Sequence, residues 1–448
     1  MQLEQKEINV HTKIILFSTL CFAVSALASP DIEYWTTDKG ADVYYVHAPE
    51  LPMVDIQIVF DAGSTRDADS LGIAMLTNSL LAEGANGEDA DTISNGFESL
   101  GAIYAADVGY DSASLQLRSL TETELLTEAI ENFKKVISTP DFPNDALERK
   151  RSQMLIAIKA KEQSPGAIAK DAFMSAIYQS HPYGKPSEGN EASIKSIKRE
   201  DIVSFYRKYY TAKNSMIAIV GAIDRKTAEQ ISEDIVNALQ DGKKAVPLSK
   251  VNKLDVSKNI FIEYPSVQTH ILVGQPGVKR GDADYFPLYV GNHILGGGGM
   301  VSRLFEEVRE KRGLSYSAYS YFSPMRFKGP FIAGLQTKTD QSDEAITVVL
   351  ENIKNYIKLG PTEEELISAK KNIIGGFPLR VDSNSKILNY VVVVGYYKLP
   401  LDYLRTFNSN VEAVTIEHIK DAFKRRLTVD KLVTVKVGTS TNNKNKEN

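Results

Sequence analysis

The sequence predicts an α+β fold in which two homologous halves each pack an antiparallel-rich β-sheet against helices. Three observations favour this fold. The chain repeats itself once, strand-like and helix-like segments are mixed without strict alternation, and 448 residues exceed the usual size of one domain. The repeat fills about half of the chain, which indicates a duplicated domain because solenoid repeats are much shorter.

The repeat is clearest towards the end of each half. Residues 197–208 and 414–425 each predict an amphipathic helix, and the β-rich runs 216–221 and 433–438 follow them at the same spacing. The pattern Gly-x-x-Tyr also recurs, at Gly101–Tyr104 and at Gly313–Tyr316. We therefore expect equivalent strands and helices in the two halves.

Each half opens with alternating strands and continues with long helices. The strands are predicted at 54–60 and 260–264, the helices at 122–137 and 344–357, and Pro140 and Pro361 follow these helices. A polar stretch rich in lysine separates the halves. The predicted organisation is an N-terminal domain (31–239), a linker (240–257), a C-terminal domain (258–438) and a disordered tail (439–448).

Residues 1–28 are predicted to be a secretory signal peptide. An apolar run at 14–24 follows Lys13, and Ala26-Leu-Ala28 is a small-x-small cleavage pattern. The alternative is a retained N-terminal anchor. We expect a periplasmic protein without stable membrane insertion after cleavage, although an extracellular destination stays open. The only cysteine, Cys21, would leave with the signal, which excludes disulfides and thiol catalysis in the mature chain. The net charge of −5 without a basic stripe argues against nucleic acid as a partner.

Two motifs in this repeated chain point to a known family. Residues 295–305 read Leu-Gly-Gly-Gly-Gly-Met-Val-Ser-Arg-Leu-Phe and continue to Arg309 and Tyr316, and residues 181–184 read His-Pro-Tyr-Gly. With the duplicated halves, these motifs resemble the pitrilysin and mitochondrial processing peptidase family, whose zinc peptidases carry an inverted His-x-x-Glu-His motif. The resemblance implies a zinc helix in the first half and a supporting Arg/Tyr pair in the second.

The zinc motif of this family is degenerate here. On the predicted helix 71–80, Met75 and Ser79 stand in place of the two histidines, and Asn78 stands in place of the glutamate base. Neutral Met and Ser are poor zinc ligands, and an amide does not take a proton from water. The helix implied to carry the third ligand has no carboxylate between Glu148 and Glu162. None of the six histidines pairs with another at helical spacing, so we expect no metal and no cofactor in this chain.

The second half keeps the other family signature. The resemblance implies that Arg309 holds a substrate carbonyl and that Tyr316 supports the tetrahedral intermediate, since both can donate hydrogen bonds without titrating at pH 7. The alternatives are a solvated helix face for Arg309 and an ordinary strand tyrosine for Tyr316. Gly296, Gly297, Gly298 and Gly299 are predicted to let a peptide approach closely, or else to form a plain turn into a helix.

The leading hypothesis is a zinc-less subunit of an exported heterodimeric peptidase. A zinc-bearing paralogous subunit would supply the metal, and this chain would supply Arg309, Tyr316 and half of a chamber for extended peptide substrates. The first alternative is a peptide-binding or assembly pseudo-peptidase without a role in catalysis. The second is an active zinc metallopeptidase, as a family label would suggest.

Overall fold

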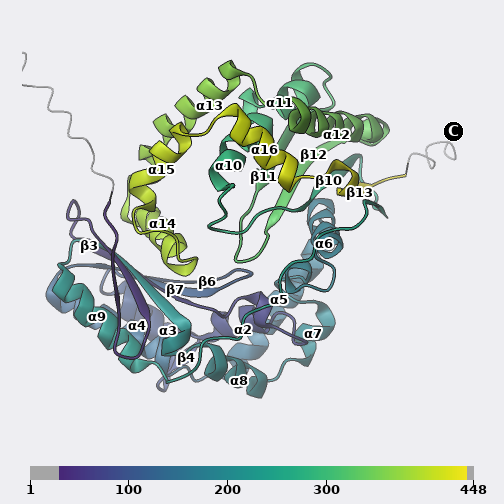
Figure 1. Cartoon of the computed structure of the whole chain (residues 1–448). Helices are drawn as coiled ribbons and strands as arrows, with labels where there is room; N and C mark the ends of the chain where they lie inside the picture. Colours follow the sequence, from purple (N-terminus) through teal and green to yellow (C-terminus); the bar gives the residue numbers. More distant parts are fainter. Residues whose placement is uncertain (1–29, 441–448) are drawn as a thin grey trace, which may run out of the picture.

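The computed structural model describes residues 30–440, so the predicted signal peptide and almost all of the predicted tail lie outside the described residues. Two sheets and their helices lie one above the other and are joined on both sides, by α14 (Asn384–Tyr396) and by α6 (Pro165–Tyr178) (Figure 1). This is the predicted α+β architecture. Within residues 30–440 no helix combines the length and the hydropathy needed to cross a membrane.

The two sheets share a five-stranded topology, to which the first sheet adds the edge strand β1, and this agreement confirms the repeat. The first has the order β1 (Glu33–Thr36), β2 (Asp42–His47), β8 (Ser215–Gly221), β3 (Met53–Phe60), β7 (Ala113–Leu120) and β6 (Ile103–Val108). The second, read in the same direction, is β9 (Lys258–Glu263), β13 (Val433–Gly438), β10 (Gln268–Pro276), β12 (Pro330–Lys338) and β11 (Ser315–Phe322). Each sheet has one parallel pair, β2–β8 and β9–β13, among antiparallel neighbours. β6 and β11 are therefore equivalent edge strands.

Helices connect and cover the strands in both halves. The first half contains α2 (Ile73–Leu80), α3 (Ala90–Glu98), α4 (Thr123–Ser138), α5 (Asn144–Lys161), α6, α7 (Glu191–Ser196), α8 (Arg199–Tyr209) and α9 (Arg225–Ala238), with the short pair β4 (Gly84–Ala85) and β5 (Glu88–Asp89). The second contains α10 (Tyr285–Asn292), α11 (Arg303–Phe305), α12 (Ser342–Leu359), α13 (Glu363–Gly376), α14, α15 (Tyr403–Glu412) and α16 (Ile416–Arg426). The predicted long helices correspond to α4 and α12.

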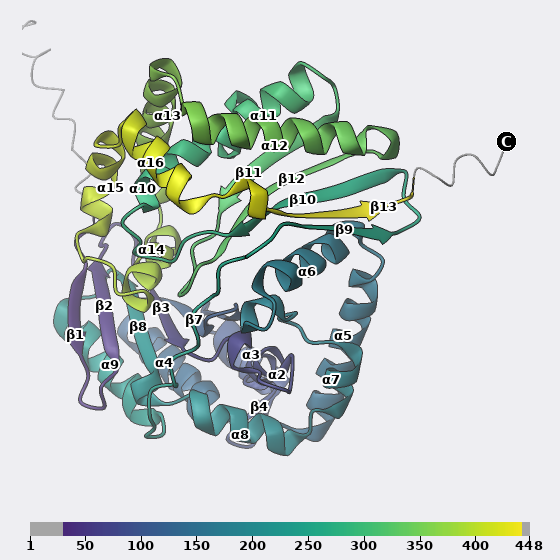
Figure 2. The ribbon, with the colours of Figure 1, turned by 45° about the vertical axis from the view of Figure 1, so that its right-hand side comes forward.

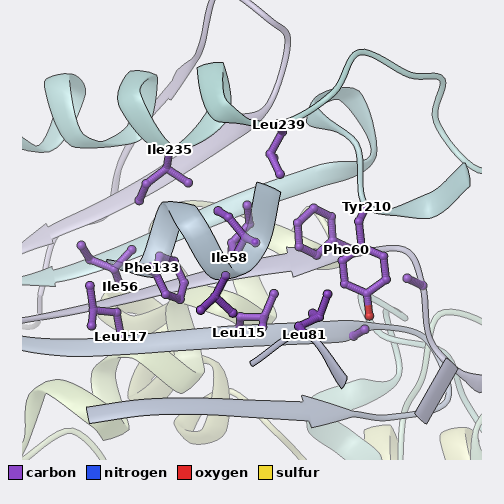
Figure 3. Close-up of a cluster of buried hydrophobic side chains, with 14 of the residues drawn as sticks. Ile56, Ile58, Phe60, Leu81, Leu115, Leu117, Phe133, Tyr210, Ile235 and Leu239 are labelled. Carbon is purple, nitrogen blue, oxygen red and sulfur yellow. The ribbon is translucent and has the colours of Figure 1, made fainter. Parts of the chain in front are cut away.

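Alternation along the strands builds the first core. Ile56, Ile58 and Phe60 of β3 point to the same face as Leu115 and Leu117 of β7, because side chains two apart share a face of a sheet. Figure 3 shows side chains of α4 and α9, Phe133 and Ile235, closing over them. Burying such aliphatic side chains contributes about 1.5–3 kcal/mol each.

Each sheet receives one helix from the other half of the chain. α6 belongs to the first half, yet its Ala169 and Phe173 are buried with Val435 and Val437 of β13. α14 belongs to the second half and lies on β2, β3 and β8; a Cβ on its Gly395 would meet Tyr44 and Met216 at 2.6 Å. Both views show these crossings (Figures 1 and 2). The two halves are therefore interlocked, which the predicted division into separate domains did not include.

A buried aspartate connects the halves a second time. Asp111, in the turn between β6 and β7, accepts hydrogen bonds from the Tyr183 hydroxyl at 2.5 Å, the Arg326 backbone N–H at 2.8 Å and the Tyr397 hydroxyl at 3.1 Å. Its carbonyl oxygen accepts from the Tyr396 hydroxyl at 2.5 Å. We call these five residues the Asp111 hub. The hub joins the β6–β7 turn to the β11–β12 loop and to the end of α14.

The predicted linker contains no regular secondary structure, but it is held at several points. Val251 and Leu254 are buried against the second sheet. The carbonyl of Val246 accepts a hydrogen bond from Arg66 at 2.6 Å, and the carbonyl of Ser249 lies 3.0 Å from Nε2 of His181. The segment is therefore packed along both halves and is not a free tether.

The hydrogen bonds of Asp284, just before α10, predict how the free energy of unfolding changes as pH falls. Arg425 donates two hydrogen bonds to its carboxylate and Arg426 donates a third, all at 2.6 Å, and chiefly the bonds from Arg425 lower the pKa of Asp284 below 3.8. A depressed pKa adds stability above the unfolded value and loses it as pH falls through the folded value. We expect Asp284→Asn to lose less unfolding free energy than the wild type between neutral pH and about pH 3. Urea titrations along this range test the expectation, with exposed Asp255→Asn as control; equal losses in all three proteins would contradict it.

Candidate functional site

Met75, Asn78 and Ser79, the three residues that the family resemblance places at the zinc motif, all lie on α2. Met75 and Ser79 are one turn apart and half-buried, so they share a face of the helix. The Ser79 hydroxyl donates to the carbonyl of Leu76 at 2.9 Å and is therefore engaged by its own helix. Neither side chain offers a charged or imidazole ligand to a metal.

Asn78 has a structural role that the sequence did not reveal. The side chain is 3% exposed, and its amide donates to the carbonyls of Asp107 at 3.2 Å and Ser114 at 3.5 Å. Its Oδ1 accepts from the hydroxyl of fully buried Tyr210 at 2.9 Å, a residue labelled in Figure 3. Donors and acceptor of Asn78 are thus used to tie α2 to β6, β7 and the end of α8.

The helix implied to carry the third ligand is α5, and it packs against α2. Met154 and Leu155 are partly buried and Ile158 is buried in the first core. This helix therefore contributes apolar contact where the family resemblance implies a carboxylate. Among the described residues, no three His, Cys, Asp or Glu side chains are grouped so that they could hold a metal ion. The donor set on α2 and α5 does not fit zinc.

Arg309 and Tyr316 are brought together in the second half. Arg309 lies in the turn η6 (Glu306–Glu310), and its guanidinium carbon is 4.4 Å from the ring centroid of Tyr316 and 4.8 Å from that of Phe305. Its nearest carboxylate is that of Glu310, at 3.6 Å. Cation–π stacking at an exposed site contributes about 0.5–1 kcal/mol, enough to favour one mutual orientation.

A β-bulge in the edge strand β11 exposes the side chain of Tyr316 to solvent. The register with β12 shifts between Ser315 and Ala318, and the Ser315 hydroxyl holds the bulge by sharing its one proton between the carbonyl oxygens of Ser317 and Gln336, both at 2.7 Å. A bulge redirects side chains out of the regular alternation. Tyr316 is 82% exposed, and its hydroxyl has no hydrogen bond within residues 30–440. The phenol is free to bind something outside this chain.

The glycine run is packed more closely than a flexible loop. Residues His293–Gly297 form a widened helical turn, η4, at the end of α10. A Cβ on Gly296 would lie 2.5 Å from the Ser320 backbone nitrogen, so glycine is needed there for contact with β11. Gly299 has φ +63° and open space around it, so glycine is needed there for the backbone conformation. Both features are requirements of the fold itself.

Two of the histidines cap helices, and a third has a different environment. His181 accepts from the Tyr183 N–H at 3.2 Å, and His418 forms a capping box with Thr415 at the start of α16. His293 lines a cavity, and its Nε2 is buried without a hydrogen-bond partner in the described part of the chain. Burial, and secondly Arg380, lowers the pKa of His293. No sequence pattern predicted this environment, because the cavity brings together residues from distant segments.

Comparison with known proteins decides the family. Residues 42–191 match the family description "Insulinase (Peptidase family M16)", and residues 196–373 match "Peptidase M16 inactive domain". A crystal structure of a peptidase M16 inactive domain from Pseudomonas fluorescens is 39% identical, with a TM-score of 0.89 over 92% of this chain and 98% of that chain. The chain belongs to the M16 peptidase family. This confirms the resemblance stated from the sequence.

Other M16 relatives span almost the same length. A protein from Helicobacter pylori described as "Non-peptidase homolog YmxG" is 28% identical over 87% of this chain and 90% of its own. A Bacillus subtilis protein described as "Uncharacterized zinc protease YmxG" is 24% identical over 89% of this chain and 96% of its own. One of these relatives is described as a non-peptidase homolog and the other as a zinc protease. The residues of α2 and α5 therefore decide whether this chain belongs with the catalytic or the non-catalytic members. They place it among the non-catalytic members of the M16 family.

Proposed function

We propose that this chain is the zinc-less subunit of an exported heterodimeric M16 peptidase and supplies Arg309 and Tyr316 to a zinc-bearing paralogue. One observation carries the proposal. The guanidinium carbon of Arg309 in η6 lies 4.4 Å from the ring centroid of Tyr316 on the edge strand β11, and the Tyr316 hydroxyl is exposed without a partner in the described chain.

The paired donors suit the carbonyl oxygen of a peptide bond under attack. A guanidinium and a phenol can both donate to developing negative charge without releasing a proton at pH 7. The edge strands β6 and β11 support binding of an extended peptide, since each has one unpaired side that could accept a further strand. Metal and general base would come from the paralogue, because Met75, Asn78 and Ser79 cannot provide them.

The proposal is tested by peptide hydrolysis with the purified chain, alone and mixed with a zinc-bearing M16 paralogue. We expect activity only in the mixture, and Tyr316→Phe should lower kcat by about 100-fold because one donor to the oxyanion is lost. The exposed hydroxyl contributes nothing to folding, so the variant should remain folded. Arg309→Ala should lower kcat/KM similarly.

Matched substitutions separate this role from general surface effects. Arg312→Ala removes a neighbouring exposed arginine that pairs with Glu307, and Tyr34→Phe removes the hydroxyl of an exposed tyrosine on β1 of the other sheet, which donates to Asp42. Neither should change the rate of the mixture. Full activity with Tyr316→Phe would favour a binding or assembly role without catalysis, and zinc with activity in the single chain would favour an active peptidase.

A further inference from the structure

A cavity of about 600 Å³ lies in the second half, between α10, the glycine run and β11. This volume is within the range of about 300–1,000 Å³ that is usual for ligand sites. All residues from Ser317 to Phe322 line it. Successive residues of a strand face opposite sides, so the cavity borders the edge of β11 as well as one face. The cavity therefore begins beside Tyr316 and follows the strand.

Two arginines line this cavity without a carboxylate partner. The Nε of Arg280 is buried and has no hydrogen bond, and the guanidinium lies 5.8 Å from the ring centroid of Tyr397. Arg380 donates to the hydroxyl of Tyr289 at 2.7 Å. Neither arginine forms an ion pair within residues 30–440, and the lining contains no Asp or Glu. The site therefore has an uncompensated positive charge.

Several other partly buried arginines are paired with carboxylates, whereas Arg199 donates only to the carbonyls of Asp141 and Phe142. Arg303 forms two 2.6 Å bonds to Glu365, and Arg426 binds Asp282 and Asp284 at the same distance. Removing a guanidinium from water without a partner costs free energy, so such groups are normally paired. In the cavity, Arg280 is partly buried and departs from this pairing, whereas Arg380 is exposed at the rim. His293 adds an unpartnered ring nitrogen to the same cavity.

Aromatic side chains form the remaining walls. Tyr285 and Tyr289 of α10 stack with ring centroids 5.8 Å apart, and Tyr319 and Tyr321 of β11 stack at 6.0 Å. Such surfaces bind apolar side chains, and their hydroxyls can fix orientation. A ligand suited to both kinds of wall carries a negative charge beside apolar groups.

We infer that this cavity binds a carboxylate of an extended peptide, adjacent to an apolar residue, and so selects the peptides that reach Tyr316. The carboxylate can be an acidic side chain or the C-terminus, since both present the same two oxygens to arginine. Tyr319 lies three residues beyond Tyr316, roughly 10 Å along the strand, so the charge would be recognised a few residues from the bond at Arg309 and Tyr316. The inference rests on the proposed function for its role, but not for the binding itself.

The test uses the single purified chain and three short apolar-rich peptides in isothermal titration calorimetry. One carries a central Glu and an amidated end, one a central Gln and a free C-terminus, and one a central Gln and an amidated end. We expect at least one carboxylate peptide to bind about 10-fold more tightly than the neutral peptide, and which one binds identifies the source. The double substitution Arg280→Gln/Arg380→Gln should abolish this preference, whereas exposed Arg312→Gln should keep it.

Equal affinity for all three peptides, or an unchanged preference in the folded double variant, would overturn the inference. If the double variant does not fold, an NMR pH titration of the His293 imidazole in the wild type tests the inference instead. A bound carboxylate should raise the pKa of His293, and an unchanged pKa would overturn the inference. Failure here is distinguishable from failure of the proposed function. If the chain prefers carboxylate peptides but the mixture does not hydrolyse peptide, only the proposed function is contradicted. If the rate of the mixture depends on Tyr316 but no carboxylate preference is found, only the inference about the cavity is contradicted.

Discussion

Asp111→Ala is expected to lower the free energy of unfolding by about 4 kcal/mol. The side chain is 5% exposed and accepts from Tyr183, Arg326 and Tyr397. Alanine would leave two phenols and one backbone N–H without an acceptor in the interior, and each such group costs about 1–3 kcal/mol. Equilibrium urea unfolding, followed by circular dichroism, measures the loss.

The neighbouring residue Asp107 provides a control in the same hairpin. Its side chain is exposed, so Asp107→Ala should change stability by less than about 0.5 kcal/mol. Hydrogen exchange adds a spatial readout: protection in the β11–β12 loop and at the end of α14 should fall in Asp111→Ala. A loss confined to the β6–β7 turn would mean that the hub does not hold the halves together.

Asn78→Glu should be as destabilising, by about 4 kcal/mol, although it restores the residue of the family motif. A glutamate would direct a carboxylate at the carbonyl oxygens of Asp107 and Ser114, which now accept from the Asn78 amide. An ionised group in this position would face two carbonyl oxygens, would be removed from water and would keep only the Tyr210 hydroxyl as a donor, which are conditions for a large penalty. The effect is measured by urea unfolding at neutral pH.

The control restores the two other motif positions alone. Met75→His/Ser79→His changes two half-buried side chains and should cost less than about 1.5 kcal/mol. Adding Asn78→Glu to this pair should lower the free energy of unfolding by the further amount expected for Asn78→Glu alone. Metal analysis of the triple variant should still find no stoichiometric zinc. A stable triple variant that binds zinc would mean that Asn78 is not locked into the core in the way its hydrogen bonds indicate.

Much of the fold was predictable because the sequence repeats its own pattern. The runs 216–221 and 433–438 became the equivalent strands β8 and β13, and the two Gly-x-x-Tyr segments became the starts of β6 and β11. In both segments the glycine has positive φ, +64° at Gly101 and +63° at Gly313. The exchange of α6 and α14 was not predictable, because an apolar helix face does not indicate which of two similar sheets it covers.

The residue types of the candidate site could be predicted from the sequence, but the surroundings of each side chain could not. The absence of ligands at Met75, Asn78 and Ser79 follows from side-chain chemistry alone. The use of Asn78 as a core hydrogen-bonding group depends on Tyr210, which is distant in sequence. The cavity beside Tyr316 likewise depends on Arg280 and Arg380, which lie on either side of β11 in the chain and carry no local motif.

The crossing of α14 has a consequence for how the chain is made. The strands of the first sheet are complete at Gly221, but the helix that covers one of its faces begins only at Asn384. At about 5–20 residues per second, that face would wait roughly 10–30 s for its cover during synthesis. Tyr44, Val59 and Met216 would be exposed to water throughout this interval. The nascent first half therefore presents an uncovered apolar surface, the kind of surface that chaperones bind, until α14 has been synthesised.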